Sequence, residues 1–152
     1  MPAYLDRMSA GIPGRVSRRG GVALEPVQLG AAMLFGAPGK IVGGKLVPLA
    51  AGDTPAAIYG FLASPFPTQS DMADLGGGSA PAETIQSVMR SGYMTVKIPG
   101  GTAAKNAPVH LITPGAAAGS IAVTGGTAIP GCEFQGAADA SGNVEISYNV
   151  GR

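Results

Sequence analysis

The order of apolar and polar positions along this chain alternates with a period of two in its clearest segments. In residues 93–98 (YMTVKI) and 144–150 (VEISYNV), apolar side chains occupy every second position. Such alternation is typical of a strand with one face buried and one face in water, as in antiparallel sheets. No sustained helical periodicity is present. The pattern predicts an all-β fold: a small antiparallel sandwich or barrel of short strands with long Gly/Pro-rich loops.

Two segments contain turn-forming residues that predict hairpins. Residues 40–49 are two short apolar runs around a Gly-Gly pair, and residues 132–150 surround the cluster DASGN at 139–143. Gly, Asn, Asp and Ser favour tight turns, because they adopt backbone conformations or make local hydrogen bonds that other residues disfavour. Both segments are therefore expected to be β-hairpins.

Four other segments are less regular. Residues 22–29 are apolar but contain Pro26, which donates no ladder hydrogen bond and so predicts an edge strand or a bulge. Residues 57–64 form an apolar run that ends at a Pro-Phe-Pro sequence. Residues 68–83 are polar and glycine-rich and are expected to form a long exposed loop. Residues 84–90 fit either a strand or one helical turn.

Charge is concentrated at the amino-terminal end. The whole chain carries a net charge of +1, yet residues 1–20 hold four arginines against one aspartate. Three glycines and two prolines in the same stretch favour an extended path. Residues 1–20 are therefore expected to form an extended basic arm, and residues 21–152 a β domain. A frayed, solvated terminus is the alternative for the first stretch.

Composition predicts a modest core. The chain has 25 glycines and 13 prolines in 152 residues, and only four phenylalanines and four tyrosines. A low net charge and a mean hydropathy of +0.26 argue against global disorder. A chain with so thin a core gains stability by burying surface against copies of itself or a partner, so a homodimer or homotrimer is expected.

The residues used in catalysis and metal binding are scarce. There is one histidine, His110, and one cysteine, Cys132, which is expected to be a small buried hydrophobe. Residues 36–40 (GAPGK) lack the Ser or Thr and the helix that follow the lysine of a phosphate loop. Asp71 and Asp74 are too few to hold calcium. These observations predict a protein that is not an enzyme and has no cofactor and no metal.

The compartment and the membrane relationship also follow from composition. One cysteine permits no internal disulfide, the first residues lack the pattern of a signal peptide, and no apolar run reaches the length of a bilayer. The chain is expected to be made in a reducing cytoplasm, or released from it by lysis, and to have no membrane contact.

The basic arm is the feature that rises above a purely structural interpretation. Its arginines suit either nucleic-acid phosphates or the carboxylates of an acidic protein surface. No aromatic residue interleaves Arg15, Arg18 and Arg19, so stacking platforms for single-stranded nucleic acid are missing. A nucleic-acid-binding β-barrel stays an alternative, and an enzyme acting on a polymer ranks below it.

Several stretches, in order and spacing, resemble a known family. They are IYGFL with PFPTQ (58–69), RSGYMTVK (90–97), KNAPV (105–109), FQGAAD (134–139) and GNVEI (142–146). Spread over most of residues 12–150, they resemble the structural cement, or head decoration, proteins of tailed bacteriophages.

The resemblance implies a non-enzymatic virion protein that is made in the bacterial cytoplasm and binds the outside of an assembled head. Proteins of this family bridge neighbouring major capsid subunits, which strengthens the shell against packaged DNA, and are small β modules that are often dimers or trimers. The expected partners are the major capsid protein and further copies of this chain, with no specific nucleic acid. The residues expected to contact the capsid are the arginines of the arm: Arg7, Arg15, Arg18 and Arg19.

Overall fold

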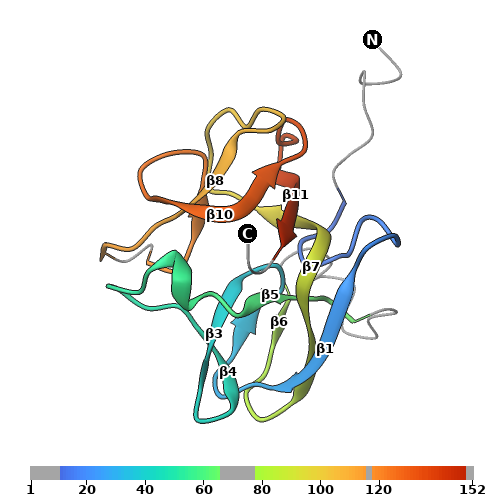
Figure 1. The fold of residues 1–152 in the computed structure, drawn as a ribbon, viewed down its shortest axis with the longest axis vertical. Helices are drawn as coiled ribbons and strands as arrows, with labels where there is room; N and C mark the ends of the chain where they lie inside the picture. The colour runs from blue at the N-terminus through green and yellow to red at the C-terminus, as the bar shows by residue number, and fades with distance from the viewer. Residues whose placement is uncertain (1–10, 66–77, 116–117, 150–152) are drawn as a thin grey trace.

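The structure is a computed structural model that describes residues 11–65, 78–115 and 118–149. Within these ranges the chain has no α-helix, and one 3-10 turn, η1 (Pro55–Ala57), interrupts the β-structure. The strands in chain order are β1 (Ala23–Gln28), β2 (Met33–Leu34), β3 (Pro38–Val42), β4 (Lys45–Pro48), β5 (Gly60–Leu62), β6 (Ser79–Ala80), β7 (Ile85–Lys97), β8 (Pro108–Leu111), β9 (Ile121–Ala122), β10 (Thr127–Phe134) and β11 (Asn143–Asn149) (Figure 1). The predicted all-β class is confirmed.

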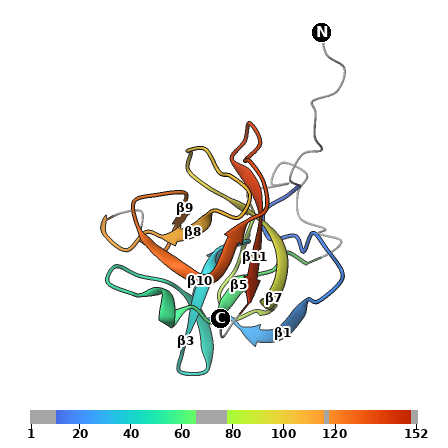
Figure 2. The ribbon, with the colours of Figure 1, turned by 45° about the horizontal axis from the view of Figure 1, so that its top comes forward.

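The main sheet is antiparallel and curls into a half-barrel. Its strand order is β4-β3-β5-β7-β11-β10-β8-β9, with β1 added to β7, while β2 and β6 form a separate two-stranded sheet. Figure 2 shows β11 between β10 and β7. In Figure 1 the strands β1, β3, β4 and β5 lie with the start of β7 in a lower lobe, and β8, β10 and β11 lie with its end in an upper lobe.

Strand β7 connects the two lobes. It is 13 residues long and joins the ambiguous segment 84–90 to the alternating segment 93–98 in one strand. Its first half pairs with both β1 and β5, and its second half pairs with β11. Ser91 lies where these partners meet, opposite Ala23 on one edge and Asn149 on the other. The tertiary pairing on both edges explains why residues 85–90 form a strand rather than a helical turn.

Two hydrophobic cores lie on opposite faces of the β5–β7 pair. Val88 and Met89 are consecutive, so their side chains point to opposite faces of the strand. Val88 packs in the smaller core of the lower lobe, and Met89 packs in the larger core. Their partners on β5 divide in the same way, since Leu62 lies opposite Val88 and Phe61 lies opposite Met89. All four side chains are completely buried.

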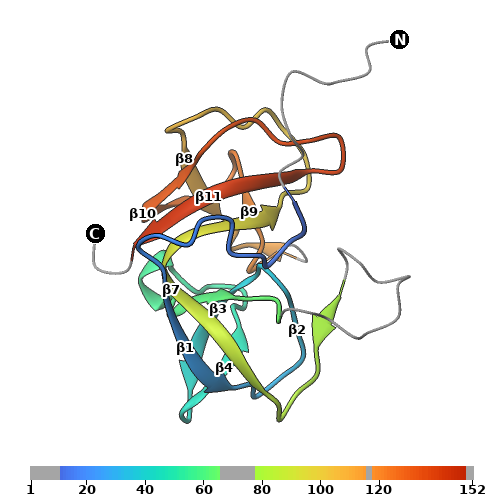
Figure 3. The same ribbon diagram turned by 90° about the vertical axis from the view of Figure 1, so that its right-hand side faces the viewer.

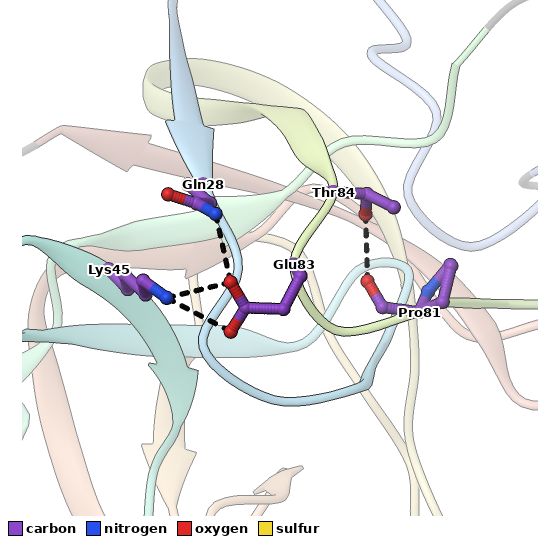
Figure 4. Close-up of polar contacts among 5 residues, drawn as sticks. All are labelled: Gln28, Lys45, Pro81, Glu83 and Thr84. Carbon is purple, nitrogen blue, oxygen red and sulfur yellow. Dashed lines mark hydrogen bonds and ion pairs between the residues drawn. The ribbon is translucent and has the colours of Figure 1, made fainter.

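Glu83 ties together the ends of three strands of the lower lobe (Figure 4). Its carboxylate accepts hydrogen bonds from Lys45 Nζ at 2.7 and 2.9 Å and from Gln28 Nε2 at 2.9 Å. Its backbone N–H donates to the carbonyl of Leu29, and the N–H of Leu29 donates to the carbonyl of Thr84, both at 2.9 Å. Glu83 adopts a φ of 63°, a conformation that normally favours glycine.

Both predicted hairpins are confirmed. Strands β3 and β4 pair around Gly43 and Gly44, whose φ values of 59° and 80° suit the tight turn that a two-residue hairpin needs. Strands β10 and β11 pair around a turn in which Asp139 Oδ1 accepts hydrogen bonds from two backbone N–H groups. Pro26 lies in β1, which pairs only with β7 among the described strands, as expected for an edge strand.

The expected loop at 68–83 lies largely outside the described residues, together with Asp71 and Asp74. Within its described part, Ser79–Ala80 form β6 rather than a loop. Strand β6 pairs with β2, and this pairing places Ala80 and Met33 in the smaller core. Burial against this core supplies a tertiary contact that the local polar, glycine-rich sequence does not reveal.

Candidate functional site

The described part of the basic arm, residues 11–20, is joined to the sheet by its backbone. The N–H of Thr95 donates to the carbonyl of Arg15 at 2.9 Å, and the N–H of Ser17 donates to the carbonyl of Tyr93 at 3.0 Å. Residues 14–17 therefore pair with the second half of β7, on the edge that β1 occupies along the first half. This pairing lies inside the range 1–20 that the sequence assigns to an extended arm.

Arg18 is held by two side chains of its own molecule. Its Nη2 lies 2.5 Å from Oε1 of Glu145 on β11. Its guanidinium carbon also lies 4.1 Å from the centroid of the Tyr93 ring on β7. The side chain of Arg18 nevertheless stays 52% exposed, so these contacts orient the guanidinium without burying it. An exposed pair of this kind contributes about 0–1 kcal/mol, and the ring contact about 0.5–1 kcal/mol.

The structure places the other predicted arginines differently. Arg15 is half-buried and lines a shallow hollow with Leu24 and Ser64. Arg19 is exposed. Arg7 lies outside the described residues. Arg15, Arg18 and Arg19 thus lie on one short segment, but their environments are not equivalent.

Most described carboxylates are engaged by groups of the same chain. Asp53 accepts a hydrogen bond from Ala50 N–H and pairs with Lys40 at 2.7 Å, and these two contacts lower the pKa of Asp53. Glu25 accepts a hydrogen bond from the Tyr59 hydroxyl, which raises the pKa of that tyrosine. The remaining ion pairs of the described residues join Glu25 to Arg90, Glu83 to Lys45 and Glu145 to Arg18.

Three cations remain outside this internal pairing. Within the described ranges, Arg19, Lys97 and Lys105 are exposed and form no ion pair. Glu133 is the exposed carboxylate there that likewise forms no ion pair. Within these described ranges, the exposed charge outside ion pairs is therefore more basic than acidic.

An apolar groove of about 480 Å³ lies beside the ends of β4 and β7. It is lined by residues 32–38, 48–49, 97–99 and 118–121. Among these lining residues Lys97 alone is charged. The groove forms only where these four segments, which are distant from one another in the sequence, come together. Local patterning does not predict it.

The two residues considered for chemistry lie within the sheet. Cys132 on β10 is buried, and desolvation raises the pKa of its thiol far above the ordinary value, so it stays protonated and unreactive. His110 on β8 has a buried Nδ1 without a hydrogen-bond partner among the described residues. In the part of the chain that the structure describes, no three His, Cys, Asp or Glu side chains gather to hold a metal ion.

Fold and surfaces define the class: a small antiparallel β module that presents basic side chains and an apolar groove. Within the described ranges, no helix has the length and apolar character needed to cross a membrane.

Comparison with known proteins assigns the family. The family model "Structural cement protein (E217 gp24/Pam3 gp6)" matches residues 2–149. A chain in the structure of the capsid of Myoviridae phage XM1 has the same fold, with a TM-score of 0.70 and 22% identity. That match covers 97% of this chain and 96% of the other. No curated protein matches the chain. The chain belongs to the structural cement proteins of bacteriophages, as the sequence resemblance predicts.

Proposed function

We propose that this protein binds the outer surface of an assembled phage head and clamps neighbouring major capsid subunits. The observation that carries the proposal is the family match over residues 2–149, nearly the whole chain. The common fold with a chain of a phage capsid structure supports it. Clamping makes each shell contact harder to open when packaged DNA presses outward.

The role we assign is structural rather than enzymatic. A nucleophilic cysteine needs an accessible, easily ionised thiol, whereas the thiol of Cys132 is buried with a raised pKa. Most charged side chains of the described residues form ion pairs within the chain, which stabilise the fold. These features support a protein that acts by binding a partner rather than by catalysing a reaction.

We place the capsid contact on the basic stretch, as the arginine content of residues 1–20 first indicates. Arg15, Arg18 and Arg19 follow one another along a segment fixed to β7, and Arg7 precedes them in the chain. Arg18 is oriented by Glu145 but half exposed, so it can meet a second carboxylate. Fixing the backbone in advance lowers the entropy lost when the arginines bind a partner.

The proposal is tested with phage heads that lack this protein. The purified chain is expected to co-sediment with such heads, saturably, and to raise the temperature at which DNA-filled heads burst. Arg15→Ser, Arg18→Ser and Arg19→Ser together should weaken binding most at low salt, where charges are least screened. The matched control is Lys40→Ser with Lys45→Ser, which removes cations already paired within the fold.

Three results would contradict the proposal. Heads that show no saturable binding, or bound heads that burst like bare ones, remove the clamping role. Affinity for DNA that survives physiological salt would instead favour a nucleic-acid-binding module.

A further inference from the structure

A polar hollow of about 380 Å³ lies on the outer face of the β7–β11 pair, beside the basic arm. Alternate residues of both strands point into the larger core, so the residues between them point outward. None of the described residues that line the hollow is charged, and four of them are glycines. Two outward-facing cross-strand pairs supply its polar groups: Ser91 with Asn149, and Tyr93 with Ser147.

Charged side chains lie on two sides of the hollow. On one side, Arg18 places its guanidinium over the Tyr93 ring, and Arg19 follows it in the chain. Figure 3 shows the blue segment before β1 running beside β7 and β11. On the other side, Glu133 of β10 lies opposite Ser147, so both side chains point to the same face of the sheet. Neighbouring strands are about 4.7–4.9 Å apart, which places Glu133 about 10 Å from Tyr93.

The charges on both sides are accessible to a partner. Arg18 is 52% exposed although it contacts Glu145, and Arg19 is exposed. Glu133 is also exposed, and neither Arg19 nor Glu133 forms an ion pair within the described ranges. The site is therefore positive on one side, negative on the other and uncharged between them. The occupant that matches it carries a carboxylate and a cationic side chain about 10 Å apart.

This charge pattern separates the candidate occupants. A nucleic-acid backbone carries negative charge only, so Glu133 and Glu145 would repel it where Arg18 attracts it. A protein segment supplies both signs of charge, and its backbone groups can hydrogen-bond hydroxyl and amide side chains. The proposed function, on which this inference rests, supplies such a partner in the major capsid protein.

We propose that the polar hollow binds a segment of a major capsid subunit through charges of both signs. A carboxylate of this segment pairs with Arg18 and Arg19, and a basic side chain of the same segment pairs with Glu133. Between these two contacts, Ser147 and Asn149 hydrogen-bond the segment. Contacts of both signs fix the direction in which the segment lies, because reversing it would bring like charges together. The proposed capsid contact of the arginines thereby gains an acidic residue.

Glu133→Gln is the decisive variant, because the arginines alone and the contact of both signs predict opposite changes in affinity. A head surface bound by the arginines alone would be bound more tightly once a negative charge is removed. The contact of both signs predicts that Glu133→Gln weakens binding to heads that lack this protein by about two- to fivefold, and Glu133→Lys by more. Co-sedimentation at low salt measures these affinities. Glu25→Gln, which removes the same charge from β1 outside the hollow, is the matched control and should not weaken binding.

Gly20→Gln tests the hollow itself. Gly20 lines the hollow next to Arg19, and a Cβ placed there would meet no atom within 4 Å, so the variant is expected to fold. Its side chain should occupy the hollow and weaken head binding about tenfold or more. Ala51→Gln, at an exposed position in the connection after β4, is the matched control and should bind like the parent chain. Urea denaturation verifies that both variants stay folded.

Failure of this contact and failure of the proposed function give different results. Heads that bind the parent chain but bind Glu133→Gln or Gly20→Gln equally well, or more tightly, overturn the contact and leave head binding intact. Heads that do not bind the parent chain overturn both. A loss of self-association in Gly20→Gln would assign the hollow to a second copy, and a loss of DNA binding would assign it to nucleic acid. Either result overturns the capsid segment as its occupant.

Discussion

Arg18 and Glu145 are 127 positions apart in the sequence, and their side chains meet at 2.5 Å between Nη2 and Oε1. The contact joins the connection before β1 to β11, the strand on the far side of β7. Tyr93 lies on the strand between them, beneath the guanidinium. The amino-terminal segment is thereby held on two neighbouring strands: its backbone pairs with β7, and the Arg18 side chain contacts Tyr93 on β7 and Glu145 on β11.

Glu145→Gln removes the charge from this pair and is expected to lower the free energy of unfolding by about 0–1 kcal/mol, as for other exposed pairs. Urea denaturation at low salt measures the loss. Glu133→Gln is the matched control, because Glu133 is an exposed carboxylate on β10 with no ion pair among the described residues. An equal loss in both variants would show that net charge, rather than the contact with Arg18, is responsible.

Asp53 should make stability depend on pH in the acid range. Its folded pKa lies below the ordinary 3.8, because the Ala50 N–H and Lys40 favour the ionised form. The stabilisation is present above about pH 4 and is lost as the pH falls through the folded pKa. The difference in unfolding free energy between the protein and Asp53→Asn should therefore be visible at pH 6 and shrink toward pH 2. A difference that grows on acidification contradicts this assignment.

Glu83 permits a test of backbone conformation against side-chain contact. Both Glu83→Gly and Glu83→Ala lose the hydrogen bonds to Lys45 and Gln28, but only alanine keeps a Cβ at a φ of 63°. The alanine variant should be less stable than the glycine variant by about 1–2 kcal/mol, the cost of a left-handed conformation for an L-residue. Chemical denaturation of the two variants gives the order directly. The reverse order would show that the segment moves away from this conformation.

Cys132 should react with thiol reagents only after the protein unfolds. Its thiol is buried, and desolvation is the main reason that its pKa is raised. A chromogenic disulfide reagent should modify the native protein very slowly and the protein in urea rapidly. Ser141→Cys in the Cys132→Ala background supplies an exposed thiol for comparison. Rapid modification of native Cys132 would mean that β10 opens readily.

Local sequence information was sufficient where a turn residue and an alternating pattern coincided. Gly43 and Gly44 specify their hairpin because the turn needs positive φ at both positions, and the pair at 132–150 follows from the Asp139 turn in the same way. Residues 84–90 stayed ambiguous, because their conformation is decided by pairing with β1 and β5 rather than by their own pattern.

The candidate site was predicted less completely than the fold. Arginine enrichment points to the basic stretch, but nothing near Arg18 in the sequence identifies Glu145 or Tyr93 as its partners. The apolar groove is harder still to predict, since Leu34 and Lys97 approach the same hollow from strands of different sheets. Such contacts depend on how the sheet curls, which single-sequence periodicity does not encode.

Strand β7 has a mechanical consequence. Because Val88 and Met89 insert into different cores, and the same strand continues into the upper lobe, no flexible linker separates two independently folded halves. Tension applied between the lobes acts along the continuous backbone of β7, which is hydrogen-bonded to other strands on both of its edges. Such tension does not separate an interface between two domains. Under the proposed clamping role, the described strand β7 would carry a load between the two lobes through its continuous backbone.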